Sequence, residues 1–308
     1  MNNNSKYENR LADKVFLGYC FSGEQYANAD SGMQIAVSED GRVFKNIADT
    51  PEPLYTADGG IRDPYLLYKN GSWYAAYTYG ENISPVMFLA KSKDLKNWTQ
   101  ICALRLDKDI PGGNNYVDVP SWIIDTDGQI HVIACVDHNH HWVEIHPLND
   151  DPETWRSITN WSSVTEITDC AGGVLIQGNS WVCVKDNIYY MCYNDLHNKT
   201  AYMRTSKNLV SGWSHPRKLD IGMELNCIET VGLTVIPDGV FRFYISCGNE
   251  LQYKQWHIDS TDNGFTWSSP VLIECRGFNH RVNWIEVACI TNHDAIVSLR
   301  ESGLLNLL

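Results

Sequence analysis

Five short polar segments of the sequence carry side chains that could do chemistry. They are Arg62-Asp63-Pro64, Asp118-Val119-Pro120-Ser121-Trp122, Gln177–Trp181, Glu229–Gly232 and Asn279–Trp284. Asp63 directly follows a cation, whereas Glu229 follows an isoleucine. A carboxyl group beside a cation tends to stay ionised, and one among apolar side chains tends to keep its proton. If the fold brings them together, the two residues could serve as a general base and a general acid.

Each of these acidic residues also has a purely structural interpretation. Asp63 can end a turn before Pro64, and Glu229 can form a structural ion pair. Glu224 and Glu286 are the nearest rival acids. The acid–base interpretation therefore depends on elements that bring Asp63 and Glu229 face to face.

Three tryptophans follow the polar segments and leave two alternatives open. Trp122, Trp181 and Trp284 each lie a few residues past a segment start. Their rings could stack against a sugar or pack between structural units.

The elements that must position these residues repeat along the chain. A polar turn that ends in a large aromatic recurs at Ser38–Phe44, Ser92–Trp98, Asp150–Trp155, Ser206–Trp213 and Ser260–Trp267. The closing aromatics are 54, 57, 58 and 54 residues apart. Ser, Asp and Asn side chains close such turns by accepting hydrogen bonds from backbone N–H groups. Five copies at one spacing indicate five repeats of one supersecondary unit.

Strand-like segments precede each turn. The clearest unit has strands at 63–68, 72–78, 86–91 and 99–103, with Asn70-Gly71 at the first hairpin. Radial repetition of such four-stranded units is a β-propeller. Residues 15–48 hold only the later strands of a unit, and 284–290 resembles the missing first strand.

We therefore predict an all-β, five-bladed propeller over residues 1–308, with residues 1–14 as an N-terminal extension. Its last blade is closed by strands from both chain ends. A long β-sandwich is the alternative, which the even repeat spacing disfavours. The innermost strands of a propeller line its axis, so the five polar segments are expected to meet at one end of it.

The composition of the chain indicates which classes of partner to exclude and which cellular compartment to expect. Hydrophobic residues make up 44% of the 308 residues, and the formal net charge is −13. Such a charge argues against a nucleic-acid partner, and no apolar run reaches the ~20 residues of a membrane span. The polar N-terminus predicts no signal peptide and a cytoplasmic protein. The ten cysteines lack any CxxC pair and are expected to be buried free thiols. The oligomeric state is left open.

Histidines raise the question of a metal. His138, His140, His141 and His146 cluster in one segment, but we expect them on an exposed loop and predict no metal there. His280 is expected at the axis, where it would contact substrate or a central structural ion or water. Apart from that ion, no cofactor is predicted.

In order and spacing, the polar segments resemble motifs of glycoside hydrolase family 43, a family of five-bladed arabinofuranosidases, xylosidases and arabinanases. Ile61–Leu66 resembles the first-blade motif with the general base, and Val119–Trp122 resembles the second-blade motif. Cys227–Gly232 resembles the motif with the general acid, and Phe278–Arg281 resembles the polar fifth-blade motif. The resemblance covers about residues 15–300.

The resemblance implies an inverting glycosidase with Asp63 as base and Glu229 as acid, which flank the scissile bond. Substrate contacts would come from a further set of side chains: Arg62, Trp122, Asn179, Trp181, His280, Arg281 and Trp284.

One motif departs from the family pattern. The family has an Asp on the third blade that orients the acid, whereas this chain has Gln177-Gly178-Asn179-Ser180 there. Asp118 or Asp169 could substitute, or Asn179 or Gln177 could orient the acid through hydrogen bonds alone.

The expected function is exo-acting hydrolysis of a short oligosaccharide, of the arabinofuranosidase or xylosidase kind used in polysaccharide degradation. A non-catalytic carbohydrate-binding propeller is the alternative from another class. A family 117-like enzyme would use a histidine such as His280 as its acid. A sialidase-like enzyme is suggested by the Ser260–Trp267 turn, but it would need three arginines and a tyrosine nucleophile at the axis.

Overall fold

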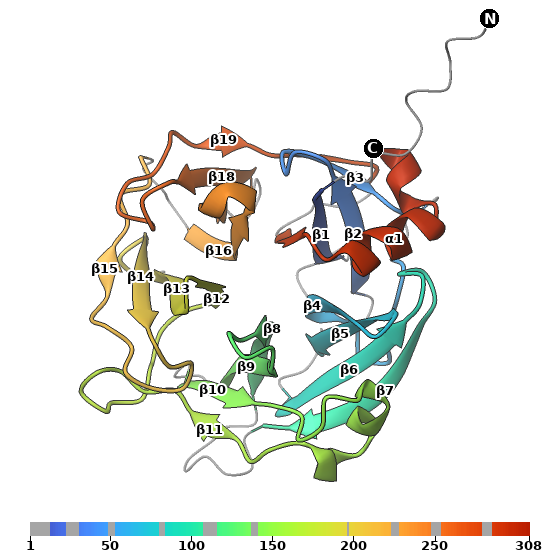
Figure 1. Ribbon diagram of the computed structural model, residues 1–308, viewed down its shortest axis with the longest axis horizontal. Coiled ribbons are helices and arrows are strands. Elements are labelled where there is room, and N and C mark those ends of the chain that lie inside the picture. Colours follow the sequence, from blue (N-terminus) through green and yellow to red (C-terminus); the bar gives the residue numbers. More distant parts are fainter. Residues whose placement is uncertain are drawn as a thin grey trace, which may run out of the picture.

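The strands of the protein form five sheets arranged in a ring. The computed structural model describes residues 13–22, 31–48, 53–79, 84–106, 116–136, 141–195, 197–222, 228–247, 254–278 and 285–308, without the side chains of residues 22 and 228–231. Seen down the shortest axis, the sheets surround a common centre with one edge strand of each facing inward (Figure 1). The predicted five-bladed β-propeller is confirmed.

Four blades are antiparallel meanders of four strands that follow one another along the chain. The first blade comprises β4 (Arg62–Lys69), β5 (Ser72–Thr78), β6 (Val86–Ser92) and β7 (Trp98–Arg105). The second comprises β8 (Val117–Ile124), β9 (Ile130–Val136), β10 (His141–Ile145) and β11 (Thr165–Glu166). The third comprises β12 (Ser180–Lys185), β13 (Ile188–Asp195), β14 (Thr200–Ser206) and β15 (Arg217–Lys218). The fourth comprises β16 (Ile228–Ile236), β17 (Val240–Cys247), β18 (Lys254–Ser260) and β19 (Val271–Leu272).

The fifth blade joins the two ends of the chain. Its inner strand β21 (Glu286–Ile290) pairs antiparallel with β1 (Val15–Ser22), so that Tyr19 lies opposite Glu286. β2 (Gly32–Ser38) and β3 (Val43–Asn46) continue the blade outward. The predicted closure is therefore confirmed, with one addition: β20 (Glu274–Arg276) pairs in parallel with β3 as a fifth strand.

The recurring turns connect the third and fourth strands of their blades, as the repeat requires. In the first blade, Asp94 Oδ1 accepts hydrogen bonds from the Lys96 and Asn97 N–H groups at 2.9 and 2.8 Å. In the fourth blade, Asp262 Oδ1 accepts from the Thr266 N–H at 2.8 Å. The same side-chain chemistry therefore forms turns at equivalent places in different blades.

The aromatic side chains that end three of these turns fill the cores between neighbouring blades. Phe44, Trp155 and Trp213 are fully buried. Trp213 packs with Ile133 of the second blade and Met191 of the third, and its Nε1–H donates to the Leu209 carbonyl at 2.8 Å. Each blade thus buries its face against the next one rather than around a single centre.

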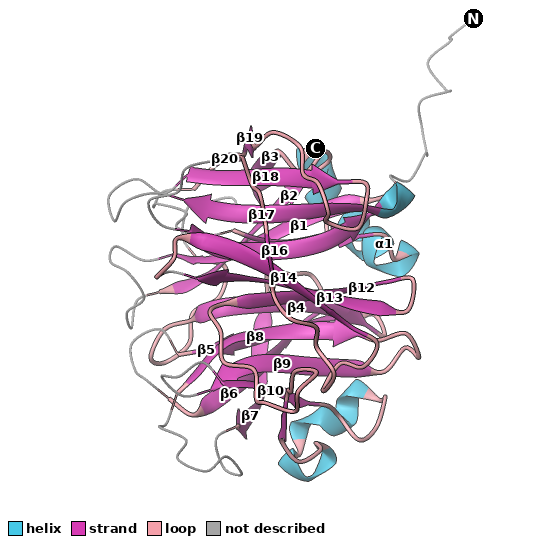
Figure 2. Ribbon diagram, turned by 90° about the vertical axis from the view of Figure 1, so that its left-hand side faces the viewer, coloured by secondary structure: helices cyan, strands magenta, loops and turns pink. Residues whose placement is uncertain are grey.

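The helices are few and lie outside the blades. α1 (His293–Glu301) follows β21 and packs Ile296 and Leu299 onto the core between the fifth and first blades. Asn292 caps it by accepting from the Ala295 N–H. The other helices are short 3-10 turns: η1 (Pro152–Arg156), η2 (Ile158–Asn160), η3 (Pro237–Gly239) and η4 (Leu304–Leu307). In the side view, α1 lies at one side of the disc (Figure 2). No helix in the described part of the chain is both long and apolar enough to cross a membrane.

Replacing Trp213 tests the contribution of the repeat aromatics to stability. Trp213→Ala should lower the free energy of unfolding by about 3–5 kcal/mol, because it opens a cavity between two blades. Phe265→Ala is the matched control in an equivalent turn, since Phe265 is 71% exposed and should cost under about 1 kcal/mol. Chemical denaturation of both variants measures the difference. Equal losses would contradict the assigned packing role.

Candidate active site

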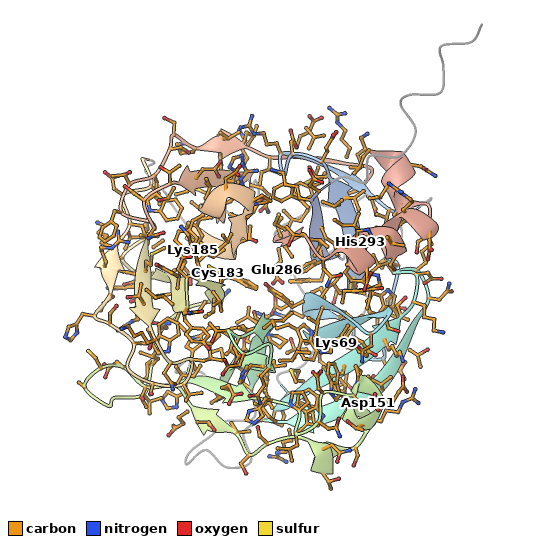
Figure 3. The ribbon with its side chains drawn as sticks, viewed as in Figure 1. Lys69, Asp151, Cys183, Lys185, Glu286 and His293 are labelled. Carbon is orange, nitrogen blue, oxygen red and sulfur yellow. The ribbon has the colours of Figure 1, made fainter. Side chains whose placement is uncertain are left out.

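The starts of three inner strands bring three carboxyl groups together at one end of the axis. Asp63 comes from β4, Asp118 from β8 and Glu286 from β21, and they are 5%, 4% and 5% exposed. The charges of Asp63 and Asp118 act on Glu286, which places all three within electrostatic reach of one another. Glu286 lies near the centre of the ring in the view down the axis (Figure 3).

Arg62 holds two of these carboxyl groups. Its Nε lies 3.3 Å from Asp63 Oδ2, and its Nη2 donates to Asp118 Oδ2 at 3.3 Å. The guanidinium thus connects the first and second blades with both branches of its fork. The expected cation therefore lies beside Asp63, although it does not keep the pKa of that carboxyl group low.

The inner strands β4 and β8 each have a bulge near their start, where Asp63 and Asp118 lie. β4 is irregular between Arg62 and Tyr65, and β8 is irregular between Asp118 and Ser121. Asp63 and Val119 each precede a proline and have φ of 47° and 43°. Positive φ is costly for a non-glycine residue, and especially for a β-branched one such as Val119. Strained backbone at equivalent positions in two blades is typical of a functional site.

Burial and neighbouring charge raise the pKa of Asp63 well above its usual value. Removal from water is the largest cause, and the Asp118 carboxyl adds to it through charge and a shared hydrogen bond. The Arg62 guanidinium and the Val119 N–H act in the opposite direction. Ionisation of Asp118 therefore disfavours ionisation of Asp63, so the two residues titrate as a pair.

Glu286 is a third acid whose charged form is disfavoured. Burial is the main cause that raises its pKa well above the usual value, and the charges of Asp63 and Asp118 raise it further. Its Oε2 atom is buried and has no hydrogen-bond partner among the described residues. A carboxylic acid that holds its proton near neutral pH is what proton donation requires.

Tyr116 was missed by the sequence interpretation. Its hydroxyl donates a hydrogen bond to Asp118 Oδ2, the same oxygen that Arg62 contacts. Burial raises the pKa of this phenol, so that it remains a donor. The signal that could have found it is its spacing of two residues from Asp118, because such residues share a face of an extended segment.

Aromatic rings from the fifth, first and third blades pack against one another, and two of them, Tyr19 and Tyr65, lie near enough to Glu286 for its charge to act on them. The Tyr65 ring stacks on that of Trp181 at 5.6 Å, and the Tyr19 ring meets Tyr65 edge-on at 5.2 Å. Trp181 is buried, so Tyr65 covers it in place of a ligand. Trp122 is also buried and stacks on Trp155 at 5.6 Å in the core between the first and second blades. Both tryptophans thus occupy the packing position that was one of their two alternatives.

The third blade brings amides rather than a carboxylate to this end. Gln177 is buried, and its Nε2 donates to Ser180 Oγ at 3.0 Å within its own blade. Asn179 is partly exposed, and its carbonyl accepts from the Asn194 N–H at 3.3 Å. Asp169 accepts from the Ala171 and Gly173 N–H groups and so closes its own turn. Of the two suggested substitutes for the missing third-blade Asp, Asp118 is the one beside Asp63.

Four other predicted site residues have no described side chain. Glu229 belongs to the inner strand β16, opposite Ser246, and β16 contacts both β12 and β21. Its backbone therefore starts an inner strand as expected, while its side chain lies outside the described part of the structure. His280, Arg281 and Trp284 also lie outside the described residues.

Comparisons with known proteins give a likeness of fold without a likeness of sequence. No protein-family model matches the chain, and no protein of curated function is detectably similar in sequence. Three similar solved structures are an exo-β-1,3-galactanase from Clostridium thermocellum, a family 43 endo-arabinanase from Bacillus licheniformis and an endo-1,4-β-xylanase from Bacteroides thetaiotaomicron.

These likenesses extend over most of the chain. The galactanase has a TM-score of 0.59 at 16% identity, over 88% of this chain and 62% of its own. The arabinanase has a TM-score of 0.53 at 14% identity, and the match covers 91% of this chain and 98% of the arabinanase. The xylanase has a TM-score of 0.55 at 15% identity, and the match covers 86% of this chain and 97% of the xylanase. At these identities the shared property is the fold.

Neutralising Glu286 should alter how stability depends on pH. An acid with a raised folded-state pKa binds its proton more tightly when folded, so ionisation destabilises the fold as pH rises above the unfolded value. Glu286→Gln removes this effect. We expect the variant to match the wild type in melting temperature near pH 4 and to exceed it near pH 8, and thermal denaturation across that range measures the difference. A variant less stable than the wild type at pH 8 would contradict the assigned environment.

Proposed function

We propose that the protein is a glycoside hydrolase that cleaves the glycosidic bond of a short oligosaccharide by inverting acid–base catalysis. The observation that carries the proposal is the buried cluster of Asp63, Asp118 and Glu286 around Arg62 at one end of the propeller axis. Glycosidases need one carboxyl group that is protonated and one that is ionised. A crowded set of carboxyl groups with one cation favours such unequal protonation.

Asp63 is the proposed general base. A carboxylate is a stronger base when its pKa is raised, and burial and Asp118 raise that of Asp63. Arg62 limits the rise and keeps an ionised form accessible. In an inverting enzyme this carboxylate removes a proton from the water that attacks the sugar carbon. Arg62, Asp118 and Tyr116 are positioning residues that hold it in place.

Glu229 is the proposed general acid, from the inner strand across the ring. Acid and base of inverting enzymes stand about 6.5–9.5 Å apart, which leaves room for the water. Asp63 and Asp118 both contact the Arg62 guanidinium, so we assign them to one side of the scissile bond rather than to opposite sides. Glu286 is the rival acid, since burial favours its protonated form.

Polysaccharide-cleaving enzymes with this fold support the substrate class. The similar structures are described as a galactanase, an arabinanase and a xylanase, whose names give glycans as their substrates. For this chain we propose an exo-acting enzyme of the arabinofuranosidase or xylosidase kind. Carbohydrate binding without turnover is the second candidate, which the amides at Gln177 and Asn179 favour.

Substitution of the carboxyl residues tests the proposal on a panel of aryl glycosides. Asp63→Asn and Glu229→Gln should each lower kcat by about 10²–10⁴-fold, the usual contribution of one acid or base. Glu286→Gln should keep most activity if Glu229 is the acid, and a reversal of that order would assign the acid to Glu286. Sugar binding without turnover by the wild type would favour the binding protein. A product that retains the anomeric configuration would contradict the inverting mechanism.

Removal of the cation should shift the pH profile of the reaction. Arg62 lowers the pKa of Asp63, so Arg62→Met should raise it and move the acidic limb of kcat/KM to higher pH. Arg62→Lys, which keeps the positive charge, is the control and should shift the limb less. Equal shifts in both variants would show that charge is not the cause.

A further inference from the structure

Two histidines and a glutamate lie together in the second blade. His131 is on β9, Glu144 is on β10, and His146 follows β10. Glu144 lies opposite Ile133 in the strand pairing, and Ile145 lies opposite Val132. Because side chains alternate between the faces of a strand, His131, Glu144 and His146 project from the same face.

The three side chains converge on one oxygen. His131 Nδ1 lies 2.6 Å from Glu144 Oε1, and His146 Nδ1 lies 2.8 Å from the same atom. One nitrogen or oxygen from each residue lies within 4.8 Å of the other two. The imidazole rings meet edge-on with centroids 5.3 Å apart.

We propose that His131, Glu144 and His146 bind a divalent first-row transition-metal ion such as Zn²⁺. Imidazole nitrogen and carboxylate oxygen are ligands that this ion prefers. Metal–ligand bonds of about 2.0–2.1 Å in a tetrahedron place ligand atoms about 3.3 Å apart. The present contacts are shorter by about 0.5–0.7 Å, so the ion fits after a small outward movement of the side chains. The ion would replace the direct contacts between the rings and the carboxylate.

The surroundings of His131 provide an independent argument. Its second nitrogen, Nε2, lies 3.1 Å from Asp125 Oδ2. Metal-ligating histidines commonly donate their other ring N–H to a carboxylate, which fixes the tautomer and orients the ligand nitrogen. Asp125 is itself held in place, because its Oδ1 accepts from the Asp127 and Gln129 N–H groups at 2.9 Å each. His131 is therefore oriented with Nδ1 toward the other two residues.

Of the three side chains, that of His146 is the most exposed, so an ion would enter from its side. The side chains of His131 and Glu144 are 10% and 3% exposed, whereas that of His146 is 28% exposed. An ion could arrive past His146 and keep a water molecule as its fourth ligand. A carboxylate as deeply buried as Glu144 also gains from a neighbouring positive charge.

This site would be structural and separate from the carboxyl cluster. His131 lies opposite Ile123 in the pairing of β8 with β9, five residues along β8 from Asp118. Five residues of a strand span about 16 Å. The ion would tie the end of β10 to the start of β9, in a blade whose outermost strand β11 has two residues.

Titration with Co²⁺ and Zn²⁺ alone tests the proposal on the full-length protein. We expect one Co²⁺ per chain, with an absorption spectrum of nitrogen and oxygen ligation, and a higher melting temperature in its presence. Zn²⁺ should displace the Co²⁺ signal. His146→Ala and Glu144→Gln should each abolish the stoichiometric binding. Glu144→Gln is nearly isosteric, so circular dichroism without metal should show that it remains folded.

Two further variants complete the test: one changes Asp125, which contacts the ligand His131, and the other changes a histidine far from the site. Asp125→Asn can still accept the turn hydrogen bonds through Oδ1 but presents an NH₂ group to His131, so Co²⁺ affinity should fall about 10–100-fold. His293→Ala on α1 is the control and should bind as the wild type does. A Co²⁺ spectrum dominated by thiolate ligands, or binding that survives both Glu144→Gln and His146→Ala, would overturn the proposal. So would the absence of stoichiometric binding by the wild type.

Discussion

The end of the propeller axis that carries the candidate site depends on the burial of several carboxyl groups with, among the described side chains, one cation. Asp63 and Asp118 contact the Arg62 guanidinium, and their charges raise the pKa of the nearby Glu286. Among the described side chains one positive charge faces three buried carboxyl groups, so ionisation of all three is disfavoured and the pKa values of Asp63 and Glu286 are raised. Retained protons make such a cluster unfavourable as a stabilising element and useful as an acid–base device. Proteins tolerate interactions of this kind where function requires them.

Ring closure connects this cluster to the stability of the whole fold. Glu286 is the first residue of β21, which the chain's C-terminal part supplies to a blade that begins at its N-terminus. The contacts that complete the ring therefore also bring the third carboxyl group to the axis. The bulges that contain Asp63 and Val119 also lie at this end, because they interrupt regular pairing beside the acidic residues of β4 and β8. Strain at these points is offset by pairing along the rest of each strand.

Much of the fold could be predicted from local signals in the sequence. The Ser-x-Asp turns and the Asn70-Gly71 hairpin reflect interactions within a few residues, and the even spacing of the closing aromatics reveals how often the unit repeats. Sites built from distant residues left weaker signals. Glu286 was only a rival acid, because nothing near it in sequence indicates its burial beside Asp63. Likewise, His131 gave no sign of Glu144 and His146, since only the pairing of β9 with β10 unites them.

In the third blade, the described residues at the start of the inner strand are amides and hydroxyls rather than a carboxyl group. The expected aspartate is absent between Gln177 and Ser180, where Gln177 instead bonds within its own blade. The effect of a charge on the pKa of a neighbouring acid depends on distance and burial, and not on the strand that carries it. Glu286 and Asp118 reach the same end of the axis from the fifth and second blades. On the proposed function, they can adjust the acidity of the catalytic carboxyl groups in place of the missing residue. Because all inner strands start at one end, a propeller offers several positions for each electrostatic role.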